Sequence, residues 1–414
     1  MSKYHLLNKA TFFPNLIEQL NQAQKIVVFD AYIWIADEIG NEVLSACLRA
    51  AERGVKIFIR HDASAGIFEH TPGRLPMFFD EVLLNQKTGN FFQQGIGFLT
   101  PKTFNALAYL IYDKQPRPVL EKSFLVQEVE KHPNIFLQDL PLFNHGKLIL
   151  IDGFAYVGGQ CISKDYTQWT DYNLKISEQI VVRNICKQIM GKLETLEPSE
   201  TIFVDNQMPK TGSDKKKSIQ YFLKNFIETS EDELLMEMAY LGKWFVPILR
   251  SALERCVHIT LLVTKNDSDT NHHTNMWVLA DLLALKSEKL KIVFAKEGMV
   301  HTKGLATRKK MTLGACNFHN ACGYFFGLNE QNIFSTNQEI VAQVFAQFEA
   351  DCLAGEVALA QSQLPKWSKA KALAEIFFVY LSSYVTFFYR KKISRWRSQV
   401  AQTLIEHSAV DFLT

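Results

Sequence analysis

Two apolar runs near the N-terminus flank a stretch with helical spacing. Residues 25–34 (KIVVFDAYIW) and 55–62 (VKIFIRHD) are typical of buried strands. Between them, residues 38–54 (EIGNEVLSACLRAAERG) carry apolar side chains at helical spacing and end at Gly54, a helix stop signal. This strand–helix–strand unit predicts a parallel sheet covered by helices.

The same order of elements returns at residues 232–267 (DELLMEMAYLGKWFVPILRSALERCVHITLLVTKND). The second unit is shorter between its tyrosine and its valine. The corresponding pairs are Tyr32 and Tyr240, Arg53 and Arg255, and Val55 and Val257. Strand–helix–strand units are common, so this match alone does not establish a repeat.

The segments that follow each unit indicate a duplication. Residues 144–161 (NHGKLILIDGFAYVGGQC) and residues 300–317 (VHTKGLATRKKMTLGACN) each contain H-x-K, an apolar run, a turn and a short strand ending in glycine. The polar stretch between the copies, residues 198–218, is typical of a linker. We therefore expect an N-terminal domain at 1–200, a linker at 201–218, a C-terminal domain at 219–360 and a helical tail at 361–414.

An H-x-K pair on a strand places both side chains on one face, because alternate residues point the same way. Lysine supplies a compact positive charge for a phosphate oxygen, and imidazole is a nucleophile or a general acid near neutral pH. A single pair is most simply a chance surface feature. Two copies that meet across a pseudo-twofold axis favour an active site for an anion, with two histidines in complementary roles.

The composition of the chain limits the possible binding partners and the cellular compartment. The net charge of +2 over 414 residues argues against a protein that holds nucleic acid mainly by bulk charge. Seven scattered cysteines form no metal-binding spacing and indicate free thiols in a reducing compartment. We expect no signal peptide at the N-terminus and no membrane-spanning run of apolar residues.

The first motif resembles the HKD motif of the phospholipase D superfamily, H-x-K-x4-D followed by a glycine-rich segment. The matching residues are His145, Lys147, Asp152, Gly158 and Gly159. The flanking segments, including YTQWTDYNLKI, are similar to those of bacterial cardiolipin synthases. The resemblance implies an α/β fold of two duplicated α/β/α domains, each with a mixed, largely parallel sheet flanked by helices and related by a pseudo-twofold axis.

That resemblance also implies a two-step transfer through a phosphatidyl-histidine. His145 is expected to be the nucleophile and His301 the acid and base, although the near-symmetry of the motifs leaves the reverse assignment open. The other implied site residues are the lysines Lys147 and Lys303, the carboxylate partners Asp171 and Glu330, and the phosphate-binding Asn317, Gly159 and Gly314. No metal or other cofactor is expected.

Each motif departs from the family pattern at a different place. The second has Thr307 or Arg308 where the aspartate belongs. We expect Asp152 to have a structural role in its turn, so that this loss need not stop the chemistry. The first has Cys161 in place of the usual asparagine, and Gln160 beside it would face the other way. The motifs favour a working but divergent enzyme over an inactive relative.

The C-terminal segment suggests where the protein acts. Residues 376–389 are uncharged and rich in aromatics, and a basic stretch with Trp396 follows. This pattern predicts an interfacial helix on anionic lipid; the alternative is an amphipathic helix packed on the core. We expect a phosphatidyltransferase or phospholipase D acting on glycerophospholipids at the cytoplasmic face of a bacterial membrane. A nuclease or other phosphodiesterase is the alternative, although no nucleic-acid partner is expected. The oligomeric state stays open.

Overall fold

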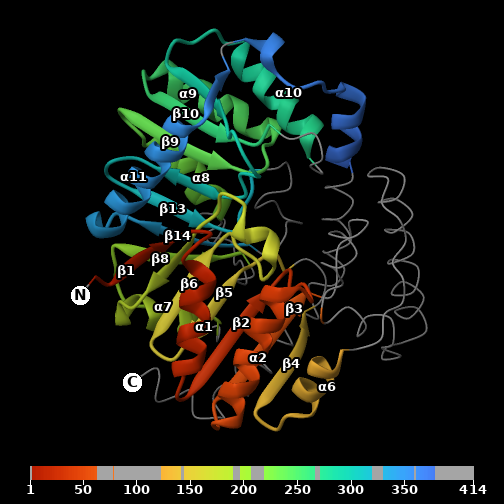
Figure 1. The fold of residues 1–414 in the computed structure, drawn as a ribbon. Helices are drawn as coiled ribbons and strands as arrows, with labels where there is room; N and C mark the ends of the chain where they lie inside the picture. Colours follow the sequence, from red (N-terminus) through yellow and green to blue (C-terminus); the bar gives the residue numbers. More distant parts are fainter. Residues whose placement is uncertain are drawn as a thin grey trace, which may run out of the picture.

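The computed structural model describes residues 2–62, 78, 123–140, 144–189, 196–206, 219–265, 271–318, 330–358 and 360–377. Within these residues the chain forms two sheets, one above the other in Figure 1, and helices cover both. The first sheet belongs to the first half of the chain and the second sheet to the second half. The two-sheet, duplicated α/β architecture expected from the sequence is confirmed.

The described strands of the first sheet follow the order β1-β7-β6-β5-β2-β3-β4. β2 pairs in parallel with β3, and β3 with β4, whereas every other pair is antiparallel. The strands are β1 (Tyr4–Leu7), β2 (Ile26–Ala31), β3 (Lys56–Asp62), β4 (Ile135–Leu140), β5 (Leu148–Ile151), β6 (Phe154–Gly158) and β7 (Asn173–Ile176). The helices are α1 (Phe12–Gln22), α2 (Glu38–Glu52), α6 (Phe124–Lys131) and α7 (Gln179–Ile189).

The second sheet has the described order β15-β11-β10-β9-β12-β13-β14-β8. Its parallel pairs are again confined to three strands, β9, β10 and β11. The strands are β8 (Thr201–Asp205), β9 (Glu233–Met238), β10 (His258–Val263), β11 (Leu290–Phe294), β12 (Lys303–Ala306), β13 (Met311–Gly314), β14 (Gln331–Ser335) and β15 (Glu356–Ala358). The helices are α8 (Ile219–Glu228), α9 (Val246–Glu254), α10 (His272–Leu283) and α11 (Gln338–Ala354).

Two expectations need correction. The sheets are mixed, but they are not largely parallel, because each H-x-K hairpin and the strand after it add antiparallel pairs. The expected linker at 201–218 begins too early: residues 201–205 form β8, which pairs antiparallel with β14. Residues 207–218 lie outside the described part of the chain. The polar residues that flank β8 concealed a strand that is buried at every position except Ile202.

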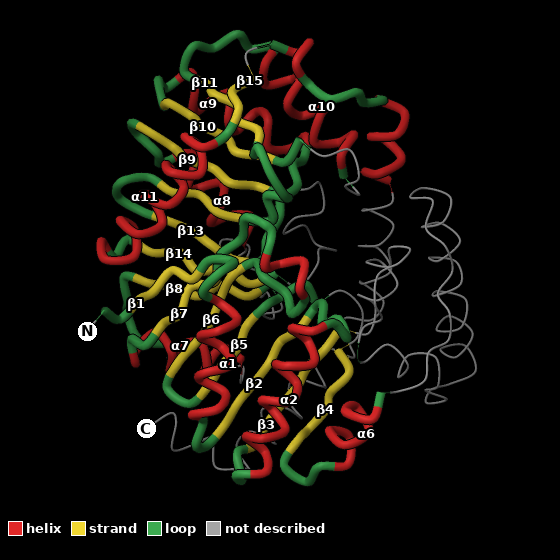
Figure 2. The backbone as a smooth tube through the Cα atoms, in the orientation of Figure 1, coloured by secondary structure: helices red, strands yellow, loops and turns green. Residues whose placement is uncertain are grey.

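The two halves share one hydrophobic core. It combines Leu148 and Val157 of the first motif hairpin with Leu313 and Ile333 of the second half, all buried. Each half also has a core of its own, in which α1 and α2, or α8, α9 and α10, pack against the sheet (Figure 2). The shared core places the two motif hairpins next to each other at the centre of the molecule.

The two motif hairpins turn in different ways. Ile151 pairs with Phe154, so Asp152 and Gly153 form a two-residue turn in which Asp152 has φ 47°. The Asp152 carboxylate accepts hydrogen bonds from the backbone N–H groups of residues 24, 25 and 26 at 2.8–3.0 Å. In the second hairpin Thr307 Oγ1 accepts from the N–H groups of residues 309 and 310. A hydroxyl therefore satisfies the longer turn that lacks the aspartate.

The predicted C-terminal tail lies mostly outside the described residues. Residues 369–377 are helical, and residues 378–414 are not described. Glu375 anchors the described helix by accepting hydrogen bonds from the backbone of residues 273 and 274 and from the Thr274 hydroxyl. None of the helices in the described part of the chain has the length and apolar content needed to cross a membrane.

Replacing Asp152 by Ala should lower the free energy of unfolding by about 1–3 kcal/mol, because three backbone donors lose a charged acceptor. Asp152→Asn, which retains one oxygen and tolerates positive φ, should cost less. Urea denaturation of both variants measures the difference. Equal stability of the Ala variant and the parent would contradict a structural role for this carboxylate.

Candidate active site

The two H-x-K pairs occupy equivalent places in the two sheets. His145 and Lys147 lead into β5, the antiparallel neighbour of β2. His301 precedes β12, the antiparallel neighbour of β9, and Lys303 is its first residue. In each half the motif therefore lies beside the first strand of the parallel unit, as the duplication in the sequence predicted.

Each histidine contacts the carboxylate of the opposite half. His145 Nδ1 lies 2.9 Å from Glu330 Oε2, and His301 Nδ1 lies 2.6 Å from Asp171 Oδ2. The sequence singled out both carboxylates but did not indicate this crossed pairing. The exchange joins the two halves into a single site that neither half can form alone.

Backbone hydrogen bonds at Thr170 hold the second crossing in place. Thr170 N–H donates to Met299 O at 2.8 Å, and Thr170 O accepts from the N–H groups of His301 at 2.8 Å and Thr302 at 3.1 Å. The segment before Asp171 thus runs beside the segment that carries His301, as a short parallel bridge between Thr170 and Val300. The side chain of Asp171 reaches His301 because its backbone is fixed one residue away.

All six charged and imidazole groups of the site are buried. His145 is 7% exposed, His301 6%, Lys147 5%, and Asp171, Glu330 and Lys303 at most 1%. Lys147 Nζ donates to His145 O at 2.7 Å. Lys303 Nζ lies 2.8 Å from Nδ1 and 2.9 Å from Nε2 of His301, and it also donates to His301 O. Such a site excludes bulk water and strengthens every charge–charge interaction within it.

Burial and neighbouring charges shift the pKa values of three groups. Burial raises the pKa of Glu330 to about 8, against the opposing effect of Lys147 and Lys303. Burial lowers the pKa of Lys303 to about 7, and Lys147 lowers it further while Asp171 raises it. Burial and then Lys303 lower the pKa of His301 to about 4, and Asp171 opposes them. Charges of each half therefore act on groups of the other.

Aromatic side chains enclose both histidines. The Tyr32 ring is 4.7 Å from that of His145, and Lys147 Nζ lies 5.1 Å from the centre of the Tyr32 ring. Tyr166 and Trp169 contact His301 at centroid distances of 5.1 and 5.6 Å. The sequence flagged Trp169 only as part of a W-x-D segment. The structure gives this segment a physical role, since Trp169 packs on the imidazole that Asp171 contacts.

The motif glycines make room for these side chains. A Cβ on Gly159 would lie 2.3 Å from Asp171 Oδ1, and one on Gly314 would lie 2.3 Å from Gln331 O. Gly159 and Gly314 were expected to bind phosphate. Their observed contacts are with the residues at and after the carboxylates, so close approach accounts for the absence of a side chain at both positions.

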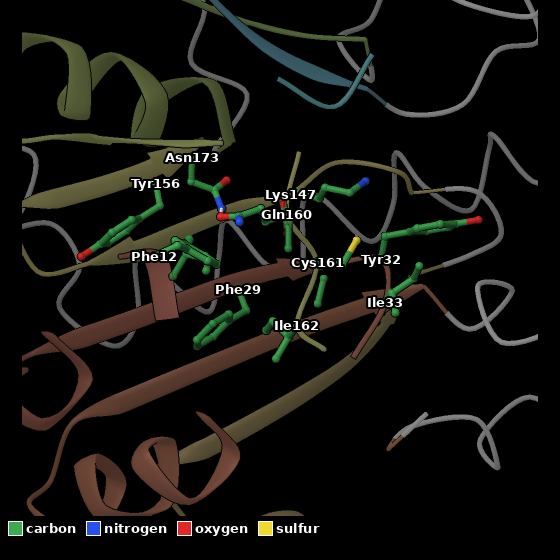
Figure 3. Close-up of a pocket in the computed structure, with 13 residues that line it drawn as sticks. Phe12, Phe29, Tyr32, Ile33, Lys147, Tyr156, Gln160, Cys161, Ile162 and Asn173 are labelled. Atoms are coloured by element: carbon green, nitrogen blue, oxygen red, sulfur yellow. Dashed lines mark hydrogen bonds between the residues drawn. The ribbon is translucent and has the colours of Figure 1, made fainter. Parts of the chain in front are cut away.

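The ends of the two glycine-rich segments differ. Gln160 points toward Asn173, which donates a 3.0 Å hydrogen bond to its side-chain oxygen, whereas Cys161 lies beside Tyr32 (Figure 3). Gln160 thus faces away from the thiol, as alternation along the strand predicted. In the second half Asn317 is 2% exposed, and its Oδ1 has no hydrogen-bond partner among the described residues.

Sequence reasoning missed a buried polar network behind the site. Gln331 Nε2 donates to Asp30 Oδ2 at 3.0 Å and to Asp205 Oδ2 at 3.3 Å, and Asp30 forms an ion pair with Arg60. Gln331 follows Glu330 directly, so the network fixes the strand that holds this carboxylate. Charged residues within the apolar runs, Asp30 and Arg60, were the available signal.

The basic turn of the second motif lies away from the histidines, at the other end of β12. Arg308 lies within 3.7 Å of Glu233 and Glu349, and Lys309 pairs with Glu231. Two of the three basic side chains of this turn therefore pair with acids of their own half, and Lys310 donates to Phe226 O and to the Thr229 hydroxyl. Among the described residues no group of three or more His, Cys, Asp or Glu side chains is arranged to hold a metal ion. No disulfide joins the described cysteines, which are Cys47, Cys161, Cys186, Cys256, Cys316 and Cys352.

Comparison with known proteins shows which protein family the chain is similar to. Residues 223–352 match the family model described as cardiolipin synthase, PLD-like domain. Cardiolipin synthase B of Shigella flexneri and that of Escherichia coli K12 are each 22% identical over 292 residues, which is 63% of this chain and 60% of the relative's length. The crystal structure of phosphatidylserine synthase from Haemophilus influenzae Rd KW20 matches with a TM-score of 0.65 at 12% identity, over 93% of this chain and 95% of that one.

The second half of the chain thus carries a PLD-like domain, and the whole chain resembles the phospholipase D superfamily in its fold and in its duplicated H-x-K motifs. Within the superfamily it is similar to the bacterial cardiolipin synthases. The resemblance stated from the motif residues is confirmed.

Gly159→Ala should displace the Asp171 carboxylate, because the new methyl group and Oδ1 cannot occupy the same space. We expect a loss of about 1–3 kcal/mol in stability and loss of the His301 Nδ1–H signal in proton NMR. Gly153→Ala is the matched control, since its Cβ meets only the end of the Gln179 side chain at 3.3 Å. An unchanged imidazole signal in Gly159→Ala would refute the contact.

Proposed function

We propose that this protein is a phosphatidyltransferase that acts on glycerophospholipids through a covalent phosphatidyl-histidine, in the manner of a cardiolipin synthase. The observation that carries the proposal is the meeting of His145, Lys147, His301 and Lys303 in one buried site with crossed carboxylates. The similarity of the chain to cardiolipin synthases supports a lipid substrate.

In the first step one imidazole Nε2 attacks the lipid phosphorus, and a P–N bond forms as the P–O bond to the leaving alcohol breaks. The other histidine gives its Nε2 proton to that alcohol. In the second step it removes a proton from an acceptor hydroxyl, whose oxygen attacks phosphorus and releases the first histidine. Lys147 and Lys303 balance the phosphate charge, and the Asn317 amide donates a hydrogen bond to a phosphate oxygen.

Burial of the site favours a lipid alcohol over water as the acceptor. None of the four histidine and lysine residues is more than 7% exposed, and aromatic rings pack against both histidines. A pocket that excludes bulk water protects the covalent intermediate from hydrolysis. Transfer between lipids is therefore the preferred reaction, with phospholipase D hydrolysis as the competing outcome.

The lipid products distinguish transfer between lipids from hydrolysis. Purified protein is incubated with phosphatidylglycerol in mixed micelles, and the products are identified by mass spectrometry. A diphosphatidyl product with release of glycerol supports transfer. Phosphatidic acid as the only product would identify the protein as a hydrolase. Nicking of plasmid DNA without any lipid product would refute the proposal. Expression in bacterial cells that lack their own cardiolipin synthases provides the matching test in membranes.

His145→Ala and His301→Ala should each lower turnover of phosphatidylglycerol by at least about a thousandfold, since each removes a group that forms a bond or moves a proton. His258→Ala is the matched control, because His258 is exposed at the start of β10. Rates are measured on variants whose thermal unfolding matches the parent. Full activity after either active-site substitution would rule out a shared site.

Substrate binding should weaken as the pH rises through about 7. Lys303, whose pKa burial lowers to about 7, is charged below that pH and neutral above it. If only the charged form holds phosphate, KM should rise by up to about tenfold per pH unit. Lys303→Arg, which stays charged, should move this rise to higher pH. The same slope in both proteins would show that another group is responsible.

A further inference from the structure

The residue that follows each crossed carboxylate makes a second contact with the opposite half. Gln331 follows one of them, and its side chain donates to Asp30 of β2 at 3.0 Å. Tyr172 follows the other, and its hydroxyl donates to Asp351 Oδ2 on α11. The crossing between the two halves is therefore repeated one residue further along the chain.

The backbone of Tyr172 holds one oxygen of Asp171 in place. Its N–H donates to Asp171 Oδ1 at 2.9 Å, which leaves Oδ2 to contact His301 Nδ1 at 2.6 Å. Its carbonyl oxygen accepts from the Gly159 N–H at 3.1 Å. Tyr172 is 3% exposed and its ring packs against that of Phe348, so its side chain has little room to move. An anchor on the hydroxyl therefore fixes the peptide group that orients Asp171.

Helix α11 of the second half supplies this anchor. The helix packs on β9 and β12 of its own half and on β1 of the first half (Figure 1). Asp351, near its C-terminal end, accepts from the Tyr172 hydroxyl at Oδ2 and from the Gln347 side-chain amide at Oδ1, the latter at 3.2 Å. Both oxygens of Asp351 therefore have donors. A helix of the second half thus holds a residue of the first half beside the site.

A buried glutamic acid lies behind this contact. Glu237 of β9 is fully buried, and neither of its side-chain oxygens has a hydrogen-bond partner among the described residues. The titratable groups that face it are Asp351 and Cys352 of α11, and Asp171 and Tyr172 of the first half. Burial and then Asp351 raise the pKa of Glu237 well above its ordinary value. An ionised Glu237 would be an unpaired charge beside two other carboxylates, whereas the neutral acid can donate its proton to Asp351.

We propose that Tyr172 and Asp351 are positioning residues for the Asp171–His301 pair, and that Glu237 beside them is a neutral carboxylic acid. The effect of these residues on turnover rests on the proposed function, because they act through a histidine of the transfer reaction. Tyr172 and Asp351 act through Asp171 rather than on the substrate. Their loss should therefore lower kcat and leave KM nearly unchanged.

Tyr172→Phe and Asp351→Asn test the positioning role. The first removes the hydroxyl and keeps the ring, and the second replaces the charged acceptor with a neutral amide. Asp171 should then be held less firmly, and the His301 Nδ1–H signal in proton NMR should move upfield. This signal is assigned by its absence from His301→Ala. The kcat for phosphatidylglycerol should fall by about ten- to a hundredfold, with KM changed by less than about twofold.

Tyr156→Phe is the matched control for these variants. Tyr156 is 1% exposed, and its hydroxyl donates to Asn15 Oδ1 at 2.9 Å. Loss of this hydroxyl should cost stability but leave the His301 signal and kcat unchanged. Thermal unfolding verifies the fold of each variant. An unchanged signal in folded Tyr172→Phe and Asp351→Asn proteins would overturn the positioning role.

Glu237→Gln tests whether the buried acid is neutral. In the unfolded chain Glu237 ionises above its ordinary pKa of 4.5, whereas the folded protein retains the proton to higher pH. The stability of the parent should therefore fall with rising pH relative to that of the Gln variant, which has no proton to lose. The difference between their unfolding temperatures should widen by about 2 °C or more from pH 5 to pH 8. Glu254→Gln, at an exposed position of α9, is the control. A constant difference would show that Glu237 is ionised in the folded protein.

The NMR and unfolding measurements contain no lipid, so they separate this inference from the proposed function. If the parent forms no lipid product but the His301 signal moves in both variants, the proposed function is wrong and the positioning contacts stand. If the parent forms a diphosphatidyl product while Tyr172→Phe and Asp351→Asn change neither the signal nor kcat, the positioning role is wrong and the proposed function stands.

Discussion

The exchange of carboxylates between the two halves is the interaction on which the site depends. Asp171 of the first half contacts His301 of the second, and Glu330 of the second contacts His145 of the first. A buried imidazole needs a partner at Nδ1 to fix its tautomer, and neither half supplies that partner to its own histidine. The duplicated chain is therefore one catalytic unit, held together by the shared core around Leu148 and Leu313.

Divergence between the halves has been tolerated where a second contact supplies what was lost. Asp152 satisfies three backbone donors near the first turn, and Thr307 satisfies the second turn with a hydroxyl. Arg308 and Lys309 of that second turn pair with acids of their own half rather than with the histidines. Loss of the turn aspartate therefore changes a hairpin and leaves His301 and Lys303 in place.

The same divergence makes the centre electrostatically asymmetric. Among the described residues Asp171 has two hydrogen-bond donors and Glu330 has one. Lys303 Nζ contacts the imidazole ring of His301, whereas Lys147 Nζ contacts the backbone oxygen of His145. In a low-dielectric pocket such differences shift proton affinities strongly. The two histidines of the duplicated motifs therefore lie in unequal electrostatic surroundings.

The sequence by itself determined the strand–helix–strand units, the duplication and the two H-x-K pairs, because these follow from local periodicity and spacing. Asp171 and Glu330 were expected only from the resemblance to a known family. The sequence also placed Gln160 facing away from the site, since side chains alternate along a strand. It did not reveal β8, the extent of antiparallel pairing, the crossed carboxylates or the network of Asp30, Arg60 and Gln331. Those depend on which segments meet in space. The proton affinities of the groups in the two H-x-K motifs were decided only by the tertiary structure, because burial and neighbouring charges depend on it.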